Sequence, residues 1–292
     1  LVLLTSGTQV VRYRMPPLVS GAAHGGIWGF GRTLRLEYSY LRSLSADAAN
    51  DSHLAFSLKE IASACTGAAE EPTQLVWSGG ARHTSRLLIS NAEPRGHTAV
   101  IGRGVLVITG GLGGLGLRVS RRLLETNAGR SLLLCSRSGK VARSGQGSES
   151  VLRALIATHR DALRILKADV AAAPEVLAIA SAAKSYATRL DGFLHMTEVL
   201  NDRLIHNLST AHLHGTYGPK AAGAWHMHAA FGRDFLSNSI MFSSVAALFG
   251  NVGAASHASA CAYLNSAAQL RVATGIASHS LALPAVLGEA GS

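Results

Sequence analysis

The chain has 292 residues, of which 48% are hydrophobic and 15% are charged, and its mean hydropathy of +0.22 excludes an intrinsically disordered or low-complexity protein. Length alone suggests two domains. Glycines interrupt the longest apolar stretch, residues 104–117, so nothing reaches the roughly 18 unbroken apolar residues of a membrane helix, and a membrane-spanning protein is excluded.

The charge balance is strongly basic, because 27 Lys and Arg stand against 17 Asp and Glu and give a formal net charge of +10. A basic chain favours acidic partners. The arginines are scattered, only 5% of the residues are aromatic, and long runs of like charge are absent, so nucleic acid is not the expected partner. A phosphorylated cofactor or an acidic protein explains the sign of the charge equally well.

The cysteines are three in number, Cys65, Cys135 and Cys261, and they are widely spaced. This spacing fits a reducing compartment and provides neither a disulfide framework nor a zinc site. The chain begins at Leu1, inside an apolar run, with neither an initiator Met nor a signal-peptide pattern. We therefore expect it to be a segment of something longer.

The first third of the chain contains a mixture of strand and helix patterns. Apolar spacing predicts strands over 1–4, 74–77 and 86–89, a short apolar run at 10–11, and helices over 27–36 and 54–65. The polar stretch 91–102, which contains Glu-Pro-Arg-Gly, is the best linker in the sequence. We place the domain boundary there, with one domain over 1–98 and the other over 99–292.

The remainder alternates regularly between short apolar runs and helical patterns. We predict strands over 105–108, 131–135, 163–167, 192–195 and 239–242, and helices over 115–126, 150–159, 174–187, 218–230 and 257–274. Continuous apolar strands separated by helices indicate a parallel sheet covered on both faces. The predicted fold class is α/β with a doubly wound parallel sheet. Residues 140–150, rich in Ser and Gly, are predicted to form a solvated connector.

A glycine-rich turn follows the first of these strands and leads directly into a predicted helix. Glycines let the backbone turn tightly and approach a pyrophosphate, whose charge then meets the positive end of the helix. A tight turn without a ligand is the alternative. Because both the strand and the helix are in place, we predict a dinucleotide site at Thr109, Gly110, Gly111, Leu112, Gly113, Gly114, Leu115 and Gly116.

The cofactor is suggested by the end of the second strand, where Ser136 and Arg137 occupy the place at which an NAD-binding domain usually has Asp or Glu. Arg137 suits a ribose 2′-phosphate, so NADPH is the predicted cofactor, and simple surface solvation is the alternative role of Arg137. After the third strand, Asp169 and Val170 are placed to contact the adenine, although a helix-capping role explains Asp169 nearly as well.

Residues 105 to about 285 resemble the short-chain dehydrogenase/reductase superfamily, and specifically the ketoreductase (KR) domain of modular type I polyketide synthases. The resemblance rests on the glycine turn, on Ser-Arg-Ser-Gly at 136–139, on the segment 218–226 and on Phe-Ser-Ser at 242–244. Residues 27–37 resemble the cofactor-free structural subdomain that precedes these reductases. The resemblance implies a truncated, Rossmann-like structural subdomain before a Rossmann-like NADPH-binding subdomain that is itself truncated at its C-terminus.

The resemblance also implies an activity, namely NADPH-dependent reduction of a β-ketoacyl thioester to the β-hydroxyacyl form. The implied partners are an acyl carrier protein, which carries the substrate on phosphopantetheine, and other polyketide synthase domains of the same chain. A cytoplasmic location follows from the same likeness. Neither a metal site nor a membrane partner is expected.

The family's catalytic Ser, Lys, Tyr and Asn are matched only in part. Ser244 matches the Ser and Lys220 the Lys, with a turn residue and a solvated helix residue as the respective alternatives. His257 stands in the Tyr position and Cys261 in the Asn position. Lys220 and an oxidised nicotinamide are both positive, so we expect a lowered His257 pKa and poor proton donation, a loss worth about 10²- to 10⁴-fold. A catalytically silent or epimerising module is therefore the alternative function.

The segment after the fourth strand departs from the family's His-Ala-Ala-Gly-Val. His195 matches the family's His, and the resemblance implies that it is a cofactor-binding residue. Glu198 adds bulk and negative charge, so we expect weakened NADPH binding. The following Leu200, Asn201 and Asp202 resemble the substrate loop of the B-type stereochemical class, with a capping role as the alternative for Asp202. Tyr263 is expected to be a core residue, and residues 281–287 lack the family's Asn-Trp-Gly-Pro-Trp pattern.

Overall fold

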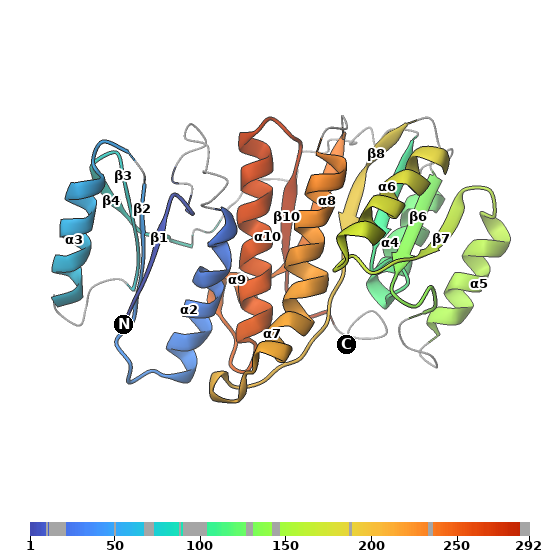
Figure 1. Ribbon diagram of the computed structural model, residues 1–292. Coiled ribbons are helices and arrows are strands. Elements are labelled where there is room, and N and C mark those ends of the chain that lie inside the picture. The colour runs from blue at the N-terminus through green and yellow to red at the C-terminus, as the bar shows by residue number, and fades with distance from the viewer. Residues whose placement is uncertain are drawn as a thin grey trace.

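The computed structural model describes residues 1–9, 11, 22–49, 51–66, 73–87, 89, 104–126, 131–141, 147–186, 189–232 and 236–286. The smaller sheet lies at one end of the molecule, and the larger sheet extends from the middle to the other end (Figure 1). Within the described ranges, none of the helices has both the length and the apolar character that crossing a bilayer requires.

The smaller sheet contains four strands in the order β1 (Val2–Ser6), β2 (Leu44–Ala48), β3 (Gln74–Ser78) and β4 (Ala81–His83). The first three are parallel, and β4 runs antiparallel to β3. Helix α2 (Gly25–Glu37) lies between β1 and β2 in the chain, and α3 (Leu54–Thr66) lies between β2 and β3. A small core forms between α3 and the sheet from Ala46, Ala48, Ile61, Leu75 and Trp77.

The larger sheet contains six parallel strands in the order β10-β9-β8-β5-β6-β7. Val107 in the central strand β5 is paired with Leu133 of β6 on one side and with Phe193 of β8 on the other. This is the strand order of a dinucleotide-binding fold, in which successive strands are added first on one side of the first strand, β5, and then on its other side. The strands are β5 (Val105–Thr109), β6 (Ser131–Ser136), β7 (Leu163–Lys167), β8 (Leu190–His195), β9 (Asn238–Ser244) and β10 (His279–Leu283).

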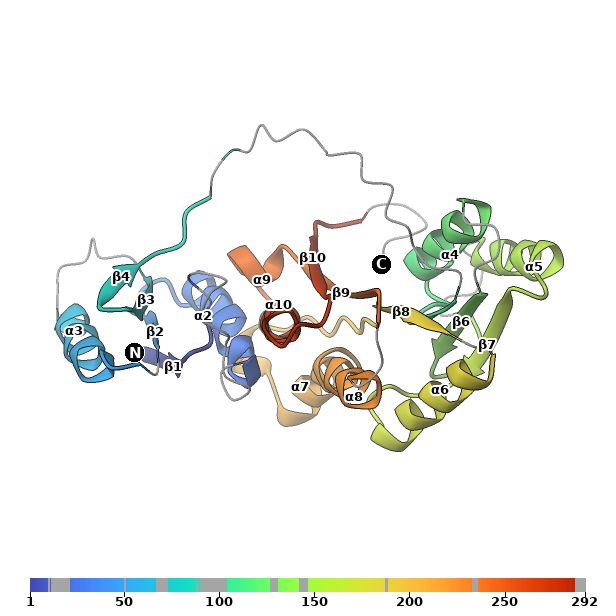
Figure 2. The same ribbon diagram turned by 90° about the horizontal axis from the view of Figure 1, so that it is seen from above.

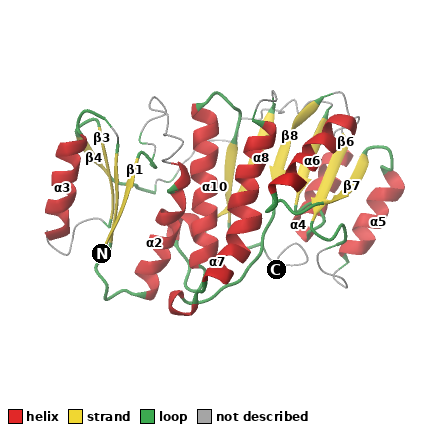
Figure 3. Cartoon of the chain, in the orientation of Figure 1, coloured by secondary structure: helices red, strands yellow, loops and turns green. Residues whose placement is uncertain are grey.

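Helices cover both faces of the larger sheet (Figure 3). Alternate residues of a strand face opposite sides, so Val105 and Val107 contribute to one core and Leu106 and Ile108 to the other. The first core includes residues of α6 (Ala173–Tyr186), α8 (Gly223–Phe231) and α10 (Ala255–Ala273). The second includes residues of α4 (Gly114–Thr126) and α5 (Ser148–Thr158). The remaining helical pieces are η1 (Ile205–Asn207), α7 (Thr210–Tyr217), η2 (Gly218–Ala222) and α9 (Ala246–Phe249).

Helix α2 packs directly against α10, so the N-terminal residues contact the helix that carries His257 (Figure 2). Glycines make this close approach possible. A Cβ atom on Gly29 would lie 2.1 Å from the backbone oxygen of Ala258. Helix α2 therefore packs on a helix that covers the larger sheet, whereas strands β1 to β4 form the smaller sheet.

The sequence predicted every strand of the larger sheet except β10, and it predicted the helices α2 to α6, α8 and α10 with small differences at their ends. The strand predicted over 86–89 is wrong. The chain reverses direction at Gly79 and Gly80, so the antiparallel partner of β3 is Ala81–His83. Leu87 and Ile89, in the predicted strand, are 85% and 98% exposed.

Strand β2 was missed because its sequence, Leu-Ser-Ala-Asp-Ala, is not an apolar run. Asp47 is buried there, and its carboxylate accepts hydrogen bonds from the Thr5 hydroxyl and the Thr8 amide. The predicted run at 10–11 falls mostly outside the described residues, since only residue 11 is described. The predicted linker 91–102 and the boundary at 98/99 also fall outside them, so the division into two domains stays a prediction.

Candidate active site

A cleft of about 900 Å³ opens at the carboxyl ends of the larger sheet. Residues at or just beyond the ends of all six parallel strands contribute to its lining. Open parallel sheets bind ligands at this edge, where the strand order reverses. The predicted site residues that line the cleft are Gly110, Leu112, Gly113, Gly114, Leu115, Gly116, Ser136, Arg137, Asp169, Val170, Leu200, Asp202, Lys220, Ser244 and His257.

Several glycines of the turn between β5 and α4 lie too close to neighbouring backbone to accept a side chain. Gly110 has a φ of +71°, and a Cβ on it would lie 2.8 Å from the Met196 oxygen. A Cβ on Gly116 would lie 2.5 Å from the Gly110 oxygen. Helix α4 begins at Gly114, and its first residues line the cleft. Backbone amides and the positive end of a helix therefore face the cleft, which fits the diphosphate of a dinucleotide.

Two predicted cofactor residues, Thr109 and His195, lie beneath the cleft and outside its lining. Both are fully buried, and Thr109 Oγ1 lies 2.9 Å from His195 Nδ1. His195 Nε2 lies 2.8 Å from the backbone oxygen of Lys220. Burial lowers the pKa of His195 to about 4, so its imidazole is neutral at pH 7. This chain of contacts links the ends of β5 and β8 to the helical segment η2, which carries Lys220.

The end of β6 forms the basic part of the cleft lining. Arg137 is exposed there, and Lys140, which the sequence analysis did not select, lines the same region. Asp169 lines the cleft after β7, and its Oδ1 accepts a hydrogen bond of 2.9 Å from the Ala171 amide. The turn-forming role of Asp169 is thus present together with its position on the cleft. Gly111 is the one residue of the glycine turn besides Thr109 outside the lining.

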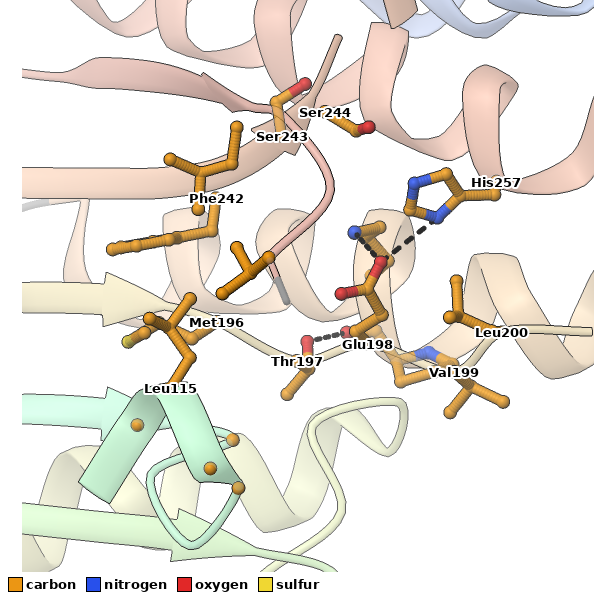
Figure 4. Close-up of a pocket in the computed structure, with 18 of the residues that line it drawn as sticks. Leu115, Met196, Thr197, Glu198, Val199, Leu200, Phe242, Ser243, Ser244 and His257 are labelled. Carbon is orange, nitrogen blue, oxygen red and sulfur yellow. Dashed lines mark hydrogen bonds and ion pairs between the residues drawn. The ribbon is translucent and has the colours of Figure 1, made fainter. Parts of the chain in front are cut away.

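The catalytic candidates meet on the opposite side of the cleft, where Glu198 lies between two of them (Figure 4). Glu198 Oε1 lies 3.3 Å from Lys220 Nζ and 3.2 Å from His257 Nδ1. The Glu198 side chain is 48% exposed, whereas Lys220 and His257 are buried. One carboxylate therefore occupies the space in front of both candidate catalytic groups.

The two imidazole nitrogens of His257 have different surroundings. Nδ1 faces Glu198 and the cleft, and Nε2 lies 3.6 Å from the Cys261 thiol one helical turn further along α10. Burial and the Lys220 charge lower the pKa of His257 to about 4, although Glu198 acts in the opposite direction. The lowered pKa agrees with the expectation from the sequence. Cys261 is fully buried behind His257, outside the cleft lining, and burial raises its pKa.

Ser244 ends strand β9 and lines the cleft on the same side as His257 (Figure 4). Its hydroxyl oxygen accepts a hydrogen bond of 3.1 Å from the Ala246 amide. The hydroxyl proton therefore stays available for another acceptor, such as a substrate carbonyl. The neighbouring Ser243 donates to the Cys261 backbone oxygen at 3.1 Å, which fixes β9 against α10.

The predicted substrate loop is only partly on the cleft, because Leu200 and Asp202 line it and Asn201 does not. Burial and the nearby Glu198 raise the pKa of Asp202. Tyr263 packs against the core and is absent from the cleft lining, as expected, and burial raises its pKa to about 12. The assignment of the loop to the B-type class stays a prediction.

Thr197 was not predicted as a site residue. Its hydroxyl donates to the Pro219 oxygen at 2.7 Å and so supports the helical segment that carries Lys220. Its position just after the end of an apolar strand and close to His195 was the available signal. All three cysteines are unpaired. In the described part of the chain, no cluster of His, Cys, Asp and Glu could hold a metal ion.

The strand order, the glycine turn and the cleft define a nucleotide-binding domain of the short-chain dehydrogenase/reductase type. The KR domain family matches residues 104–288. The chain therefore belongs to the KR domain family, the ketoreductase domains of polyketide synthases.

Relatives and solved structures agree with this membership. A mycocerosic acid synthase-like polyketide synthase of Mycolicibacterium smegmatis is 32% identical over 227 residues, which are 73% of this chain and 10% of that protein. A phenolphthiocerol/phthiocerol polyketide synthase of Mycobacterium tuberculosis is 30% identical over 257 residues, 87% of this chain and 14% of the relative. The chain thus spans a small part of these relatives.

Among solved structures, an A-type ketoreductase from a modular polyketide synthase is 28% identical, with a TM-score of 0.81 over 96% of this chain and 57% of that one. The ketoreductase from the first module of phoslactomycin biosynthesis in Streptomyces sp. HK803 is 26% identical, with a TM-score of 0.82 over 98% of this chain and 64% of that one. The α/β fold class is confirmed.

Proposed function

We propose that this chain binds NADPH and reduces a β-ketoacyl thioester, presented by an acyl carrier protein, to the β-hydroxyacyl form. The observation that carries the proposal is the single cleft in which the glycine turn, Lys220, Ser244 and His257 meet. We further propose that the reaction takes place in the cytoplasm, in keeping with the three unpaired thiols, alongside other polyketide synthase domains of the same chain.

The cofactor is assigned from the chemistry of the cleft. The glycine turn and the start of α4 suit the diphosphate, and Arg137 with Lys140 suits the 2′-phosphate that distinguishes NADPH from NADH. Asp169 and Val170 border the place for the adenine. When bound, NADPH supplies the hydride that the carbonyl carbon accepts.

The protein's own residues bind and protonate the carbonyl oxygen of the substrate. The Ser244 hydroxyl donates a hydrogen bond to it and so stabilises the negative charge that develops there. The imidazolium form of His257 donates the proton from Nδ1, the nitrogen that faces the cleft. Lys220 adds positive charge beside the same oxygen. Glu198 contacts Nδ1 and the Lys220 ammonium at the same time, so its carboxylate must move away from Nδ1 before the proton is donated to the substrate.

An absorbance assay tests the proposal directly. The purified chain is mixed with NADPH and a β-ketobutyryl pantetheine thioester, and we expect the nicotinamide absorbance to fall. Ser244→Ala should abolish this loss, whereas the control Ser185→Ala, an exposed residue of α6, should not change it. Oxidation of NADPH that persists in Ser244→Ala contradicts the assignment of Ser244.

The contact of Glu198 with Lys220 and His257 favours a second candidate, a catalytically silent or epimerising module. In that case the Glu198 carboxylate keeps both groups occupied, and the chain binds NADPH without oxidising it. Epimerisation would appear as exchange of the substrate's α-hydrogen with deuterium from D₂O while the NADPH absorbance stays constant. Simultaneous measurement of both signals separates the two functions.

A further inference from the structure

Two loops of different origin border the cleft near His257. The first follows β8 and contributes Leu200 and Asp202 to the lining, and the second precedes α10 and contributes Gly250, Asn251 and Ala254. The loops touch each other, because the Arg203 amide donates to the Gly253 oxygen at 2.6 Å. An isolated bridge joins Arg203 to Ala254 beside this bond. Their relative position therefore determines the width of this side of the cleft.

A single carboxylate from the N-terminal part of the chain binds both loops. Glu37 Oε2 accepts a hydrogen bond of 2.6 Å from the Ile205 amide, and Glu37 Oε1 accepts one of 2.9 Å from the Gly253 amide. Bonds from amides to an ionised carboxylate are stronger than bonds between neutral groups. Glu37 thus links the end of one loop to the middle of the other.

Local helix energetics do not explain an acid at this position. Glu37 is the last residue of α2, and negative charge at a helix C-terminus is unfavourable because the carbonyl end already carries partial negative charge. The two loop amides supply the compensating interaction. The position of Glu37 is therefore accounted for by its tertiary contacts.

The rest of α2 holds helix α9 and the second loop, which follows α9, from the same side. Arg32 Nη1 donates to the Ala247 oxygen, and the Thr33 hydroxyl accepts a hydrogen bond of 3.4 Å from the Asn251 amide. Gly250 has a φ of +76°, and a Cβ on it would lie 2.8 Å from the carbonyl carbon of Arg32. The second loop therefore lies against α2 at Gly250, Asn251 and Gly253. Among the described contacts, Glu37 is the only one of these side chains that also reaches the first loop.

We propose that Glu37 is a positioning residue that sets the substrate side of the cleft by holding these two loops together. Glu37 is outside the cleft lining, so it acts through the loops and touches neither substrate nor cofactor. The inference rests on the proposed function, because it names the acyl substrate as the ligand that depends on Glu37. The cofactor regions, the glycine turn and Arg137, lie on other strand ends and carry no contact with Glu37 in the described structure.

The test compares Glu37→Gln with a matched control, Glu60→Gln on α3. Glutamine keeps the size of the side chain, but its amide nitrogen cannot accept a hydrogen bond, so one of the two loop contacts is lost. Three quantities are measured in each variant: hydrogen exchange of the peptides around residues 205 and 253, the Kd of NADPH by fluorescence, and the Kd of a substrate analogue by calorimetry. The analogue is a β-ketoacyl pantetheine in which a methylene group replaces the thioester sulfur.

We expect Glu37→Gln to speed exchange in both peptides and to weaken binding of the analogue about tenfold, the loss typical of one hydrogen bond to a charged group. The Kd of NADPH should stay unchanged, and Glu60→Gln should alter nothing. Unchanged analogue binding overturns the proposal, and so does an equal loss of analogue and NADPH binding, which marks a general structural role. If Glu37→Gln does not fold, Glu37→Asp, which keeps the charge but shortens the reach, is judged by the same criteria.

Failure of the proposed function has a different signature. It shows as the absence of NADPH oxidation by the unaltered chain, while the exchange rates and the analogue Kd remain measurable. The two hypotheses are therefore tested separately.

Discussion

The pH dependence of reduction provides a direct test of the proton donor. Only the imidazolium form of His257 can donate a proton, and burial together with the Lys220 charge lowers the His257 pKa to about 4. At pH 7, three units above that value, about one molecule in a thousand carries the proton. The active fraction rises about tenfold for each unit by which the pH falls. We therefore expect kcat to increase about a hundredfold between pH 8 and pH 6.

The assay measures NADPH oxidation at saturating NADPH and thioester in a buffer of constant ionic strength. A matched variant, His257→Tyr, replaces the imidazole by a phenol, which stays protonated throughout this range. It should react about 10²- to 10³-fold faster at pH 7, within the range expected for a positioned general acid, and its rate should lose the rise toward acid pH. Deuterium at the transferred position of NADPH shows whether the chemical step limits the rate.

A kcat that is constant between pH 8 and pH 6, with a full deuterium isotope effect, would refute the reasoning. The proton would then come from a group other than His257. An increase in rate toward alkaline pH would refute it equally, because it would require a base in place of the acid.

Three further predictions concern the cofactor and the fold. Glu198→Gly should tighten NADPH binding by about three- to tenfold in fluorescence titrations, a modest gain because the carboxylate is 48% exposed and its charge is screened. Arg137→Ala should weaken NADPH binding about tenfold and leave the Kd of NADH unchanged, because only NADPH carries the 2′-phosphate. The free energy of unfolding, measured with urea, should fall as the pH decreases from about 6.5 to about 4, because the unfolded chain protonates His195 first while burial keeps the folded pKa at about 4. Over this whole pH range, the difference between the unfolded and folded pKa values of His195 corresponds to a loss of about 3 kcal/mol in the free energy of unfolding.

Matched variants decide each of these outcomes. Glu198→Gln keeps the bulk and removes the charge, so a gain seen only in Glu198→Gly assigns the effect to bulk, and no gain in either contradicts the expected clash. Arg153→Ala on α5 serves as the control for Arg137→Ala, and equal losses for NADPH and NADH would contradict the 2′-phosphate role. His195→Gln should reduce the acid-dependent loss of stability, and an unchanged pH profile would contradict it.

The centre of the larger sheet could be predicted from local sequence because the strands β5, β6 and β8 are buried on both faces. Val105 to Ile108 is a continuous apolar run, and the glycines that follow it indicate a tight turn. Prediction from apolar runs fails where buried polar groups form hydrogen bonds with one another. Asp47 is buried in β2 through bonds to Thr5 and Thr8, which are about forty residues away in the chain, so the strand has no local apolar signature.

The site shows the same division. Ser244, Lys220 and His257 were recognised by their spacing and by resemblance, and the structure brings them to one cleft. The sequence placed His195 among the cofactor residues, but the fold buries it under the cleft, where its Nε2 contacts the backbone oxygen of Lys220. Glu198 was expected to disturb the cofactor, and its contacts with Lys220 and His257 depend on side-chain directions that no spacing reveals.

By itself, the sequence determined the class of fold, the glycine turn and the substitution of His for the usual phenol, because these depend on residues close together in the chain. Only the tertiary structure decided which groups from distant parts of the chain meet. Glu37 lies 168 residues before Ile205 and 216 before Gly253, and the packing of α2 on α10 is what brings its carboxylate to both loops. Such contacts follow from how helices and sheets pack, and local patterns carry no information about them.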